Sequence, residues 1–114
     1  MTTIYHNPLC SKSRQTLALI KEKGINPTVV HYLETPLKYA TITSLLGQLG
    51  LSVRDIIRTG EDIYKELQLN DPSLSEKELV QAIIEHPKLL ERPIVVKDNK
   101  AVIGRPPENV LTLL

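Results

Sequence analysis

The chain has 114 residues and a formal net charge of +1, with 41% hydrophobic and 24% charged residues. This size and balance are typical of a globular protein, and we expect one domain over residues 1–114. The near-neutral charge and the absence of a long apolar run argue against a nucleic-acid partner and a membrane span. The N-terminus lacks the pattern of a secretion signal, and a single cysteine cannot form an internal disulfide, so we expect a reducing cytoplasmic location.

The first part of the chain predicts a strand, a helix and a second strand. Residues 3–6 are expected as a short strand, and the helical pattern of residues 11–23 ends at Gly24. Residues 28–33, with the sequence TVVHYL, are β-branched and mostly apolar, which is typical of a strand. A strand, helix and strand in this order indicate a parallel pair with a right-handed crossover.

The middle of the chain predicts helices only. Apolar residues within 42–49 follow the i, i+3, i+4, i+7 spacing of an amphipathic helix. Short helices are expected over residues 52–57 and 61–67. Ser75 and Glu78 have the spacing of a capping box before an apolar run, which predicts the start of a further helix.

The last part predicts a hairpin and a closing helix. Residues 94–97 and 101–103 are two apolar stretches joined by the polar turn Asp-Asn-Lys, and residues 108–113 are expected to be helical. The element order is therefore β-α-β, a helical insert, and then β-β-α. This order predicts an α/β protein with the thioredoxin-like fold, in which a mixed four-stranded sheet carries the insert between its two parts.

The only cysteine, Cys10, lies in IYHNPLCSKSRQTL, at the predicted junction of the first strand and helix. Unpaired N–H groups at a helix N-terminus and nearby cations both lower the pKa of a thiol, and His6, Lys12 and Arg14 are close in sequence. The alternative is a small buried hydrophobic residue. The polar and basic neighbours favour a reactive thiolate, although spacing alone leaves both interpretations open.

Ser13 stands where a redox protein with a C-x-x-C motif would have its second thiol. Its hydroxyl could donate a hydrogen bond to the thiolate or cap the helix, but a resolving sulfur must come from outside, most simply from glutathione and a partner oxidoreductase. His6 could favour the thiolate when protonated, or be a polar surface residue. His31 and His86 have no metal-like spacing with Cys10, so no zinc site is expected.

Three arginines lie at predicted element boundaries: Arg58, Arg92 and Arg105. Binding and catalytic residues often lie at such boundaries, although a single arginine is more often a surface charge or an ion-pair partner. Together near one thiolate, they could bind a tetrahedral oxyanion through paired donors. They could also stabilise the charge that grows on a departing oxygen.

The chain resembles the glutaredoxin-coupled arsenate reductases over nearly its whole length. The resemblance rests on IYHNPLCSKSRQTL, VVHYLETP, SVRDIIRTGEDIY, HPKLLERPIVV and IGRPPENVL. It implies that Cys10 attacks arsenate. It also implies that the three arginines named above bind the oxyanion, that His6 lowers the pKa of the thiol, and that Ser13 lies beside the thiolate.

The resemblance further implies reduction of arsenate to arsenite, with glutathione as the external reductant and glutaredoxin reducing the resulting mixed disulfide. It implies a thioredoxin-like fold with a cis bond between Arg92 and Pro93. We expect no bound cofactor or metal, no nucleic-acid or membrane partner, and a monomer.

Two other functions stay open on the same scaffold. A glutathione-dependent thiol transferase or glutathione-binding protein would use the arginines for the carboxylates of glutathione. An Spx-like regulator would instead bind the transcription machinery without catalysis. Spx-like regulators use a C-x-x-C switch, and Ser13 in place of the second cysteine argues against that switch.

Overall fold

The computed structural model describes all residues from 1 to 114. Its contacts divide the chain into two compact units. The sheet unit comprises Met1–Thr35 and Arg92–Leu114, and the helical unit comprises Pro36–Glu91. The expected helical insert is thus a compact body of its own, and the single domain over residues 1–114 stays a prediction.

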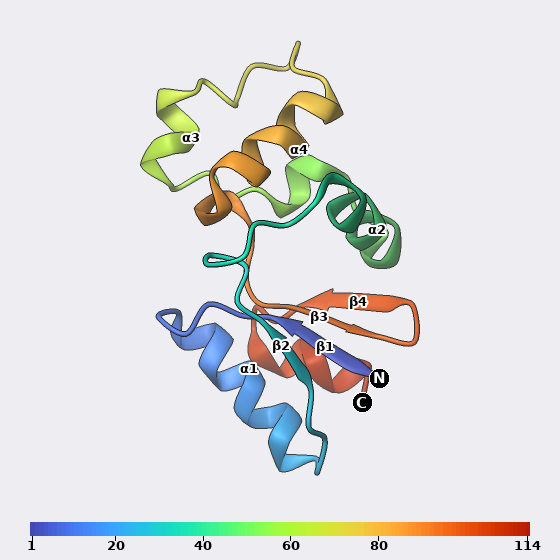
Figure 1. The fold of residues 1–114 in the computed structure, drawn as a ribbon. Coiled ribbons are helices and arrows are strands. Elements are labelled where there is room, and N and C mark those ends of the chain that lie inside the picture. Colours follow the sequence, from blue (N-terminus) through green and yellow to red (C-terminus); the bar gives the residue numbers. More distant parts are fainter. The chain divides into compact units, whose positions relative to one another are not determined.

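The sheet unit contains a mixed four-stranded sheet in the order β2-β1-β3-β4 (Figure 1). The strands are β1 (Thr2–Tyr5), β2 (Thr28–Val30), β3 (Ile94–Lys97) and β4 (Lys100–Ile103). β1 is parallel to β2 and antiparallel to β3, and β3 is antiparallel to β4. The predicted parallel β-α-β pair and the predicted hairpin are therefore both confirmed, as is the thioredoxin-like fold class.

Two helices, α1 (Ser11–Glu22) and the 3-10 helix η3 (Pro107–Thr112), contact each other beside the sheet. The strand register pairs Ile4 with Val95, so both side chains point to the same face of the sheet. That face forms the core of the unit with residues of the two helices. The fully buried members of this core are Ile4, Ile20, Val95 and Val110.

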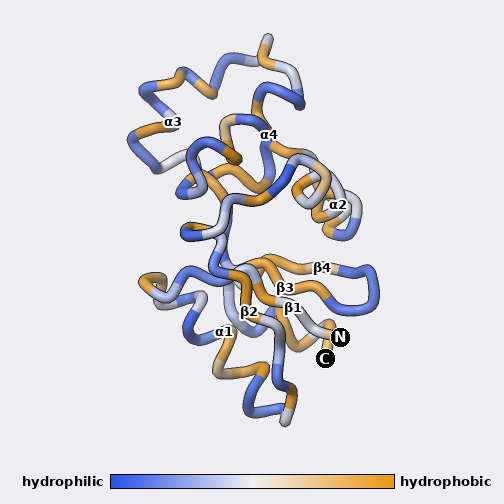
Figure 2. The backbone as a smooth tube through the Cα atoms, viewed as in Figure 1, coloured by the Kyte–Doolittle hydropathy of each residue, from blue (hydrophilic) through white to orange (hydrophobic).

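The β3–β4 hairpin turns at Asp98 and Asn99, whose φ angles are +52° and +64°. Asp and Asn tolerate this left-handed conformation better than other residues with a side chain, and two such residues make the turn that suits a tight hairpin. The turn is hydrophilic, whereas the strands that it joins are mostly hydrophobic (Figure 2).

The helical unit is built from short helices around α4. Its elements are α2 (Tyr39–Leu49), η1 (Val53–Ile56), α3 (Asp62–Glu66), α4 (Glu76–Glu85) and η2 (Pro87–Leu89). α4 contacts α2, η1 and η2, and its apolar face is buried against them. None of the helices in the structure has the length and apolar composition that crossing a membrane requires.

Local capping signals fix where these helices begin and end. The N–H of Glu78 donates to Oγ of Ser75 over 3.1 Å, and the N–H of Ser75 donates back to Oε1 of Glu78 over 3.2 Å. This reciprocal pair is the predicted capping box. At the other end of a helix, Gly50 has a φ of +68° and ends α2 in the left-handed conformation that glycine favours.

The second strand and the closing helix differ from the predicted ones in length or type. The second strand ends at Val30, because β1 itself ends at Tyr5, which pairs with Val30. The backbone then turns, with the carbonyl of His31 accepting from the N–H groups of residues 34 and 35. The closing helix has 3-10 geometry and begins at Pro107.

Candidate active site

The thiol of Cys10 lies at the N-terminus of α1, where the sequence predicted it. Cys10 is the N-cap residue, with extended backbone angles, and its carbonyl accepts the first helical hydrogen bond from the N–H of Arg14 over 3.0 Å. The first N–H groups of α1 have no partner within the helix and are available to the sulfur. The side chain is partly buried.

The surroundings of the sulfur favour its ionised form. Partial burial raises the pKa of the Cys10 thiol, but the N–H of Ser13, the side chain of Arg92 and the N–H of Lys12 lower it. The lowering effects prevail, so the pKa lies below its ordinary value. A thiolate is the nucleophilic form of cysteine. The structure therefore agrees with a reactive thiol more than with a buried apolar residue.

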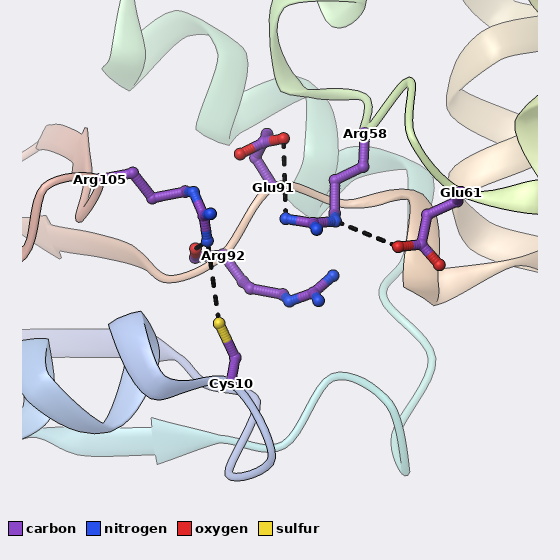
Figure 3. Close-up of polar contacts among 6 residues, drawn as sticks. All are labelled: Cys10, Arg58, Glu61, Glu91, Arg92 and Arg105. Carbon is purple, nitrogen blue, oxygen red and sulfur yellow. Dashed lines mark hydrogen bonds and ion pairs between the residues drawn. The ribbon is translucent and has the colours of Figure 1, made fainter.

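Arg105 lies beside this sulfur. Its Nη1 is 3.8 Å from Sγ of Cys10 and 3.3 Å from the carbonyl oxygen of Arg92, and Figure 3 shows the guanidinium pointing toward the thiol. The hairpin register explains how the two arginines meet. Ile94, the first residue of β3, pairs with Ile103, the last residue of β4. Arg92, two residues before the first, and Arg105, two residues after the second, therefore flank the same end of the hairpin.

Arg92 brings an unused hydrogen-bond donor to the same place. Its Nε is buried and has no hydrogen-bond partner. A buried donor without an acceptor costs free energy, which an arriving anionic oxygen would recover. The bond from Arg92 to Pro93 is cis, as the resemblance implied, and the bond from Arg105 to Pro106 is also cis.

Arg58 belongs to the helical unit, where it forms two ion pairs. Its Nε is 3.4 Å from Oε2 of Glu61 and its Nη1 is 4.0 Å from Oε1 of Glu91 (Figure 3). Its backbone N–H donates to the carbonyl of Leu89 over 2.7 Å. The ion-pair interpretation of this arginine is therefore realised in the structure, and its place in an oxyanion site stays a prediction.

The side chain of Ser13 is engaged away from the sulfur. Its hydroxyl oxygen lies 2.6 Å from Nδ1 of His6 and accepts from the N–H of Asn7 over 3.0 Å. The backbone N–H of Ser13, and not its hydroxyl, is the group that lowers the pKa of Cys10. Ser13 thus acts on the thiol through the helix N-terminus, whereas the sequence suggested its hydroxyl.

The surroundings of His6 disfavour the protonated form that was expected of it. Burial lowers the pKa of His6, and the positive charges of His31, Arg14 and Lys21 lower it further. These effects favour the neutral imidazole, whose Nδ1 lies within hydrogen-bond distance of the Ser13 hydroxyl. Burial disfavours the charged ring, so the structure gives no support to a protonated His6, and the effect of His6 on the thiol stays a prediction.

The loop between β1 and α1 is fixed by the side chains of Asn7 and Arg14. Oδ1 of Asn7 accepts from the N–H of Leu9 over 3.0 Å, and Nη1 of Arg14 donates to the carbonyl of Pro8 over 2.8 Å. Arg14 thus holds the loop that carries the thiol. The Asn-Pro pair in the sequence was the available signal for such a turn.

Comparisons with known proteins identify the family and several relatives of this chain. The sequence profile of the ArsC family matches residues 5–113. The chain is 60% identical over 112 residues to the Escherichia coli K12 protein named "Uncharacterized protein YfgD", covering 97% of this chain and 94% of that protein. It is 50% identical over 112 residues to a Haemophilus influenzae protein named "Arsenate reductase", covering 97% of each.

A solved structure agrees closely with this fold. The arsenate reductase from Vibrio cholerae superposes with a TM-score of 0.97 at 54% sequence identity, covering 99% of this chain and 97% of that one.

Proposed function

Because the chain belongs to the ArsC family, we propose that it reduces arsenate to arsenite with Cys10 as the nucleophile. The observation that carries the proposal is a single thiol of lowered pKa with the Nη1 of Arg105 3.8 Å from its sulfur. Relatives at 48–50% identity that bear the name arsenate reductase support the choice of substrate. A thiolate repels an anionic substrate, so this chemistry requires cations beside the sulfur.

In the first step, Sγ of Cys10 bonds to arsenic and one arsenic–oxygen bond breaks, with the oxygen leaving as water after protonation. Arg92 and Arg105 bind the remaining oxygens and neutralise the charge that develops on them. The unpartnered Nε of Arg92 supports this assignment, because it is a donor for which the protein supplies no acceptor. Arg58 is proposed as a third ligand of the oxyanion.

In the second step, the thiolate of glutathione attacks the sulfur of the adduct. A sulfur–sulfur bond forms, the sulfur–arsenic bond breaks, and its electron pair reduces arsenic from the +5 to the +3 state. The product arsenite leaves behind a mixed disulfide of Cys10 and glutathione. The chain has no second cysteine to resolve this disulfide, so an external dithiol such as glutaredoxin must reduce it.

The proposal is tested by coupling the reaction to glutathione reductase. The protein is mixed with arsenate, glutathione and glutaredoxin, and oxidation of NADPH is followed. We expect an arsenate-dependent rate that disappears in Cys10→Ser. The Ser44→Ala variant, at an exposed position in α2 away from the thiol, serves as a control that the loss comes from the nucleophile and not from substitution in general.

Two outcomes would count against arsenate reduction. One is the absence of an arsenate-dependent rate in the wild-type protein, and the other is an unchanged rate in Cys10→Ser. Turnover of a glutathionylated peptide without any effect of arsenate would point instead to a thiol transferase. A stable complex with RNA polymerase that survives Cys10→Ser would point to a regulator.

A further inference from the structure

We propose that Gly104, together with Asn109, is a positioning residue that holds the backbone of Arg105 so that its guanidinium reaches the sulfur of Cys10. Neither residue touches the thiol. The inference rests on the proposed role of Arg105 at the thiol. Its test needs no arsenate turnover, so its failure can be distinguished from failure of the proposed reaction.

Gly104 directly follows β4 and is buried between α1 and the segment that carries Arg92. A Cβ atom at this position would lie 2.6 Å from Oγ1 of Thr16, 3.1 Å from Cγ2 of Thr16 and 2.8 Å from Cγ of Pro93. Thr16 belongs to α1, the helix that begins after Cys10, and Pro93 directly follows Arg92. Any side chain larger than hydrogen would therefore push the end of β4 away from both neighbours.

The close approach is reinforced by hydrogen bonds. The N–H of Gly104 donates to the carbonyl of Pro93 over 2.9 Å, and its carbonyl lies 3.5 Å from Oγ1 of Thr16. Thr16 is fully buried and its hydroxyl also donates to the carbonyl of Lys12 over 2.8 Å. The threonine that Gly104 approaches is thus itself fixed and cannot easily move aside.

Asn109 fixes the other side of the same turn. Its Nδ2 donates to the carbonyls of Ile103 and Arg105, over 3.2 Å and 3.3 Å. One amide group therefore holds the residues before and after Gly104. With the contacts to Thr16 and Pro93, it determines where the side chain of Arg105 starts.

The backbone of Gly104 does not require glycine. Its φ lies outside the left-handed region, so an alanine could adopt it without backbone strain. The effect of Gly104→Ala should therefore come from the contacts alone. Gly47, in α2, is the matched control, because a Cβ there would meet nothing within 4 Å.

The test compares alkylation of Cys10 by iodoacetate, which is anionic, and by iodoacetamide, which is neutral. Both reagents need the thiolate, so the ratio of their rates is independent of the ionised fraction and reports positive charge at the sulfur. Gly104→Ala should lower this ratio by about threefold, the scale of a partly screened interaction between unit charges. Arg105→Ala should lower it equally, and the double variant should show no further loss.

Gly47→Ala should leave the ratio at the wild-type value. A folded Gly104→Ala variant with the wild-type ratio would overturn the inference, as would a double variant whose ratio falls well below that of Arg105→Ala. Should Gly104→Ala fail to fold, the same ratio of alkylation rates is measured in Asn109→Ala. A lowered ratio there supports the inference, and a ratio equal to that of the exposed control Asn26→Ala overturns it.

Discussion

Nδ1 of His6 lies 2.6 Å from the hydroxyl oxygen of Ser13, and both side chains are buried. The same hydroxyl accepts from the N–H of Asn7, so it joins the end of the first strand to the first turn of α1. The N–H of Ser13 in that turn lowers the pKa of Cys10. The hydrogen bond of His6 thus helps to hold the helix turn that carries this N–H.

This relationship predicts a loss of stability in acid. The pKa of His6 in the folded chain lies below its ordinary value of 6.5, because burial and nearby cations disfavour the charged ring. As the pH falls below 6.5, His6 becomes protonated in the unfolded chain before it does in the folded chain. The free energy of unfolding therefore decreases. We expect His6→Gln to lose less stability than the wild type between about pH 7 and about pH 5.

Urea unfolding at the two pH values measures this difference. His86→Gln is the control, since it also removes one histidine but lies in the helical unit. If His6→Gln kept the whole wild-type pH dependence, the neutral and buried state of His6 would be the wrong explanation.

Arg92→Ala should weaken arsenate turnover while leaving the fold intact. Removing one charge-assisted hydrogen bond to the oxyanion should lower kcat/KM by an amount that corresponds to about 1.5–3 kcal/mol of lost transition-state stabilisation. Arg92→Lys should recover only part of this loss, because lysine keeps the charge without the forked donors. Steady-state kinetics with arsenate measure the effect, and Lys97→Ala, at the far end of β3, is the control. Wild-type kinetics in Arg92→Ala would remove this residue from the site.

Ser75→Ala should destabilise the protein without affecting the thiol. The substitution removes the hydroxyl that accepts from the N–H of Glu78 at the start of α4. Loss of an N-cap of this kind costs about 1 kcal/mol. Ser44→Ala, at an exposed position inside α2, should have the opposite sign because alanine is the better helix former. Thermal unfolding distinguishes the two, and equal shifts would mean that the capping box is not formed.

Much of the fold could be predicted because its signals are local. Ser75 with Glu78, Gly50 after its helix, and the polar turn at residues 98–99 each specify a boundary through their own side chains or backbone. The length of the second strand could not be predicted in this way. Its apolar character continues to Leu33, but a strand needs a partner, and β1 ends first.

The site follows the same division between local and long-range information. The position of Cys10 before a helix is a local property, and the sequence predicted it. The approach of Arg105, 95 residues later, depends on the β3–β4 register, which places it beside Arg92. The charge state of His6 depends on burial, which no spacing in the sequence reveals. For that reason the sequence could not show that its surroundings disfavour the protonated form, and its role at the thiol stays a prediction.

Arg54 and Arg58, both in the helical unit, provide the last test. Arg54 donates to the backbone carbonyls of Leu69 and Asp71, over 2.8 Å and 2.6 Å, and so ties a loop to η1. Arg58 makes only two long ion pairs and keeps 22% of its side chain exposed. Pairs of that kind contribute at most about 1 kcal/mol to stability.

We therefore expect the two arginines to have separable effects. Arg54→Gln should lower the free energy of unfolding by about 1–2 kcal/mol and leave arsenate kinetics unchanged where the protein is folded. Arg58→Gln should barely change stability but lower kcat/KM for arsenate, because a ligand of the oxyanion is lost. Unfolding curves and kinetics on the same preparations measure both. Unchanged kinetics in Arg58→Gln would mean that Arg58 serves only its two glutamates, and that the oxyanion is bound by Arg92 and Arg105 alone.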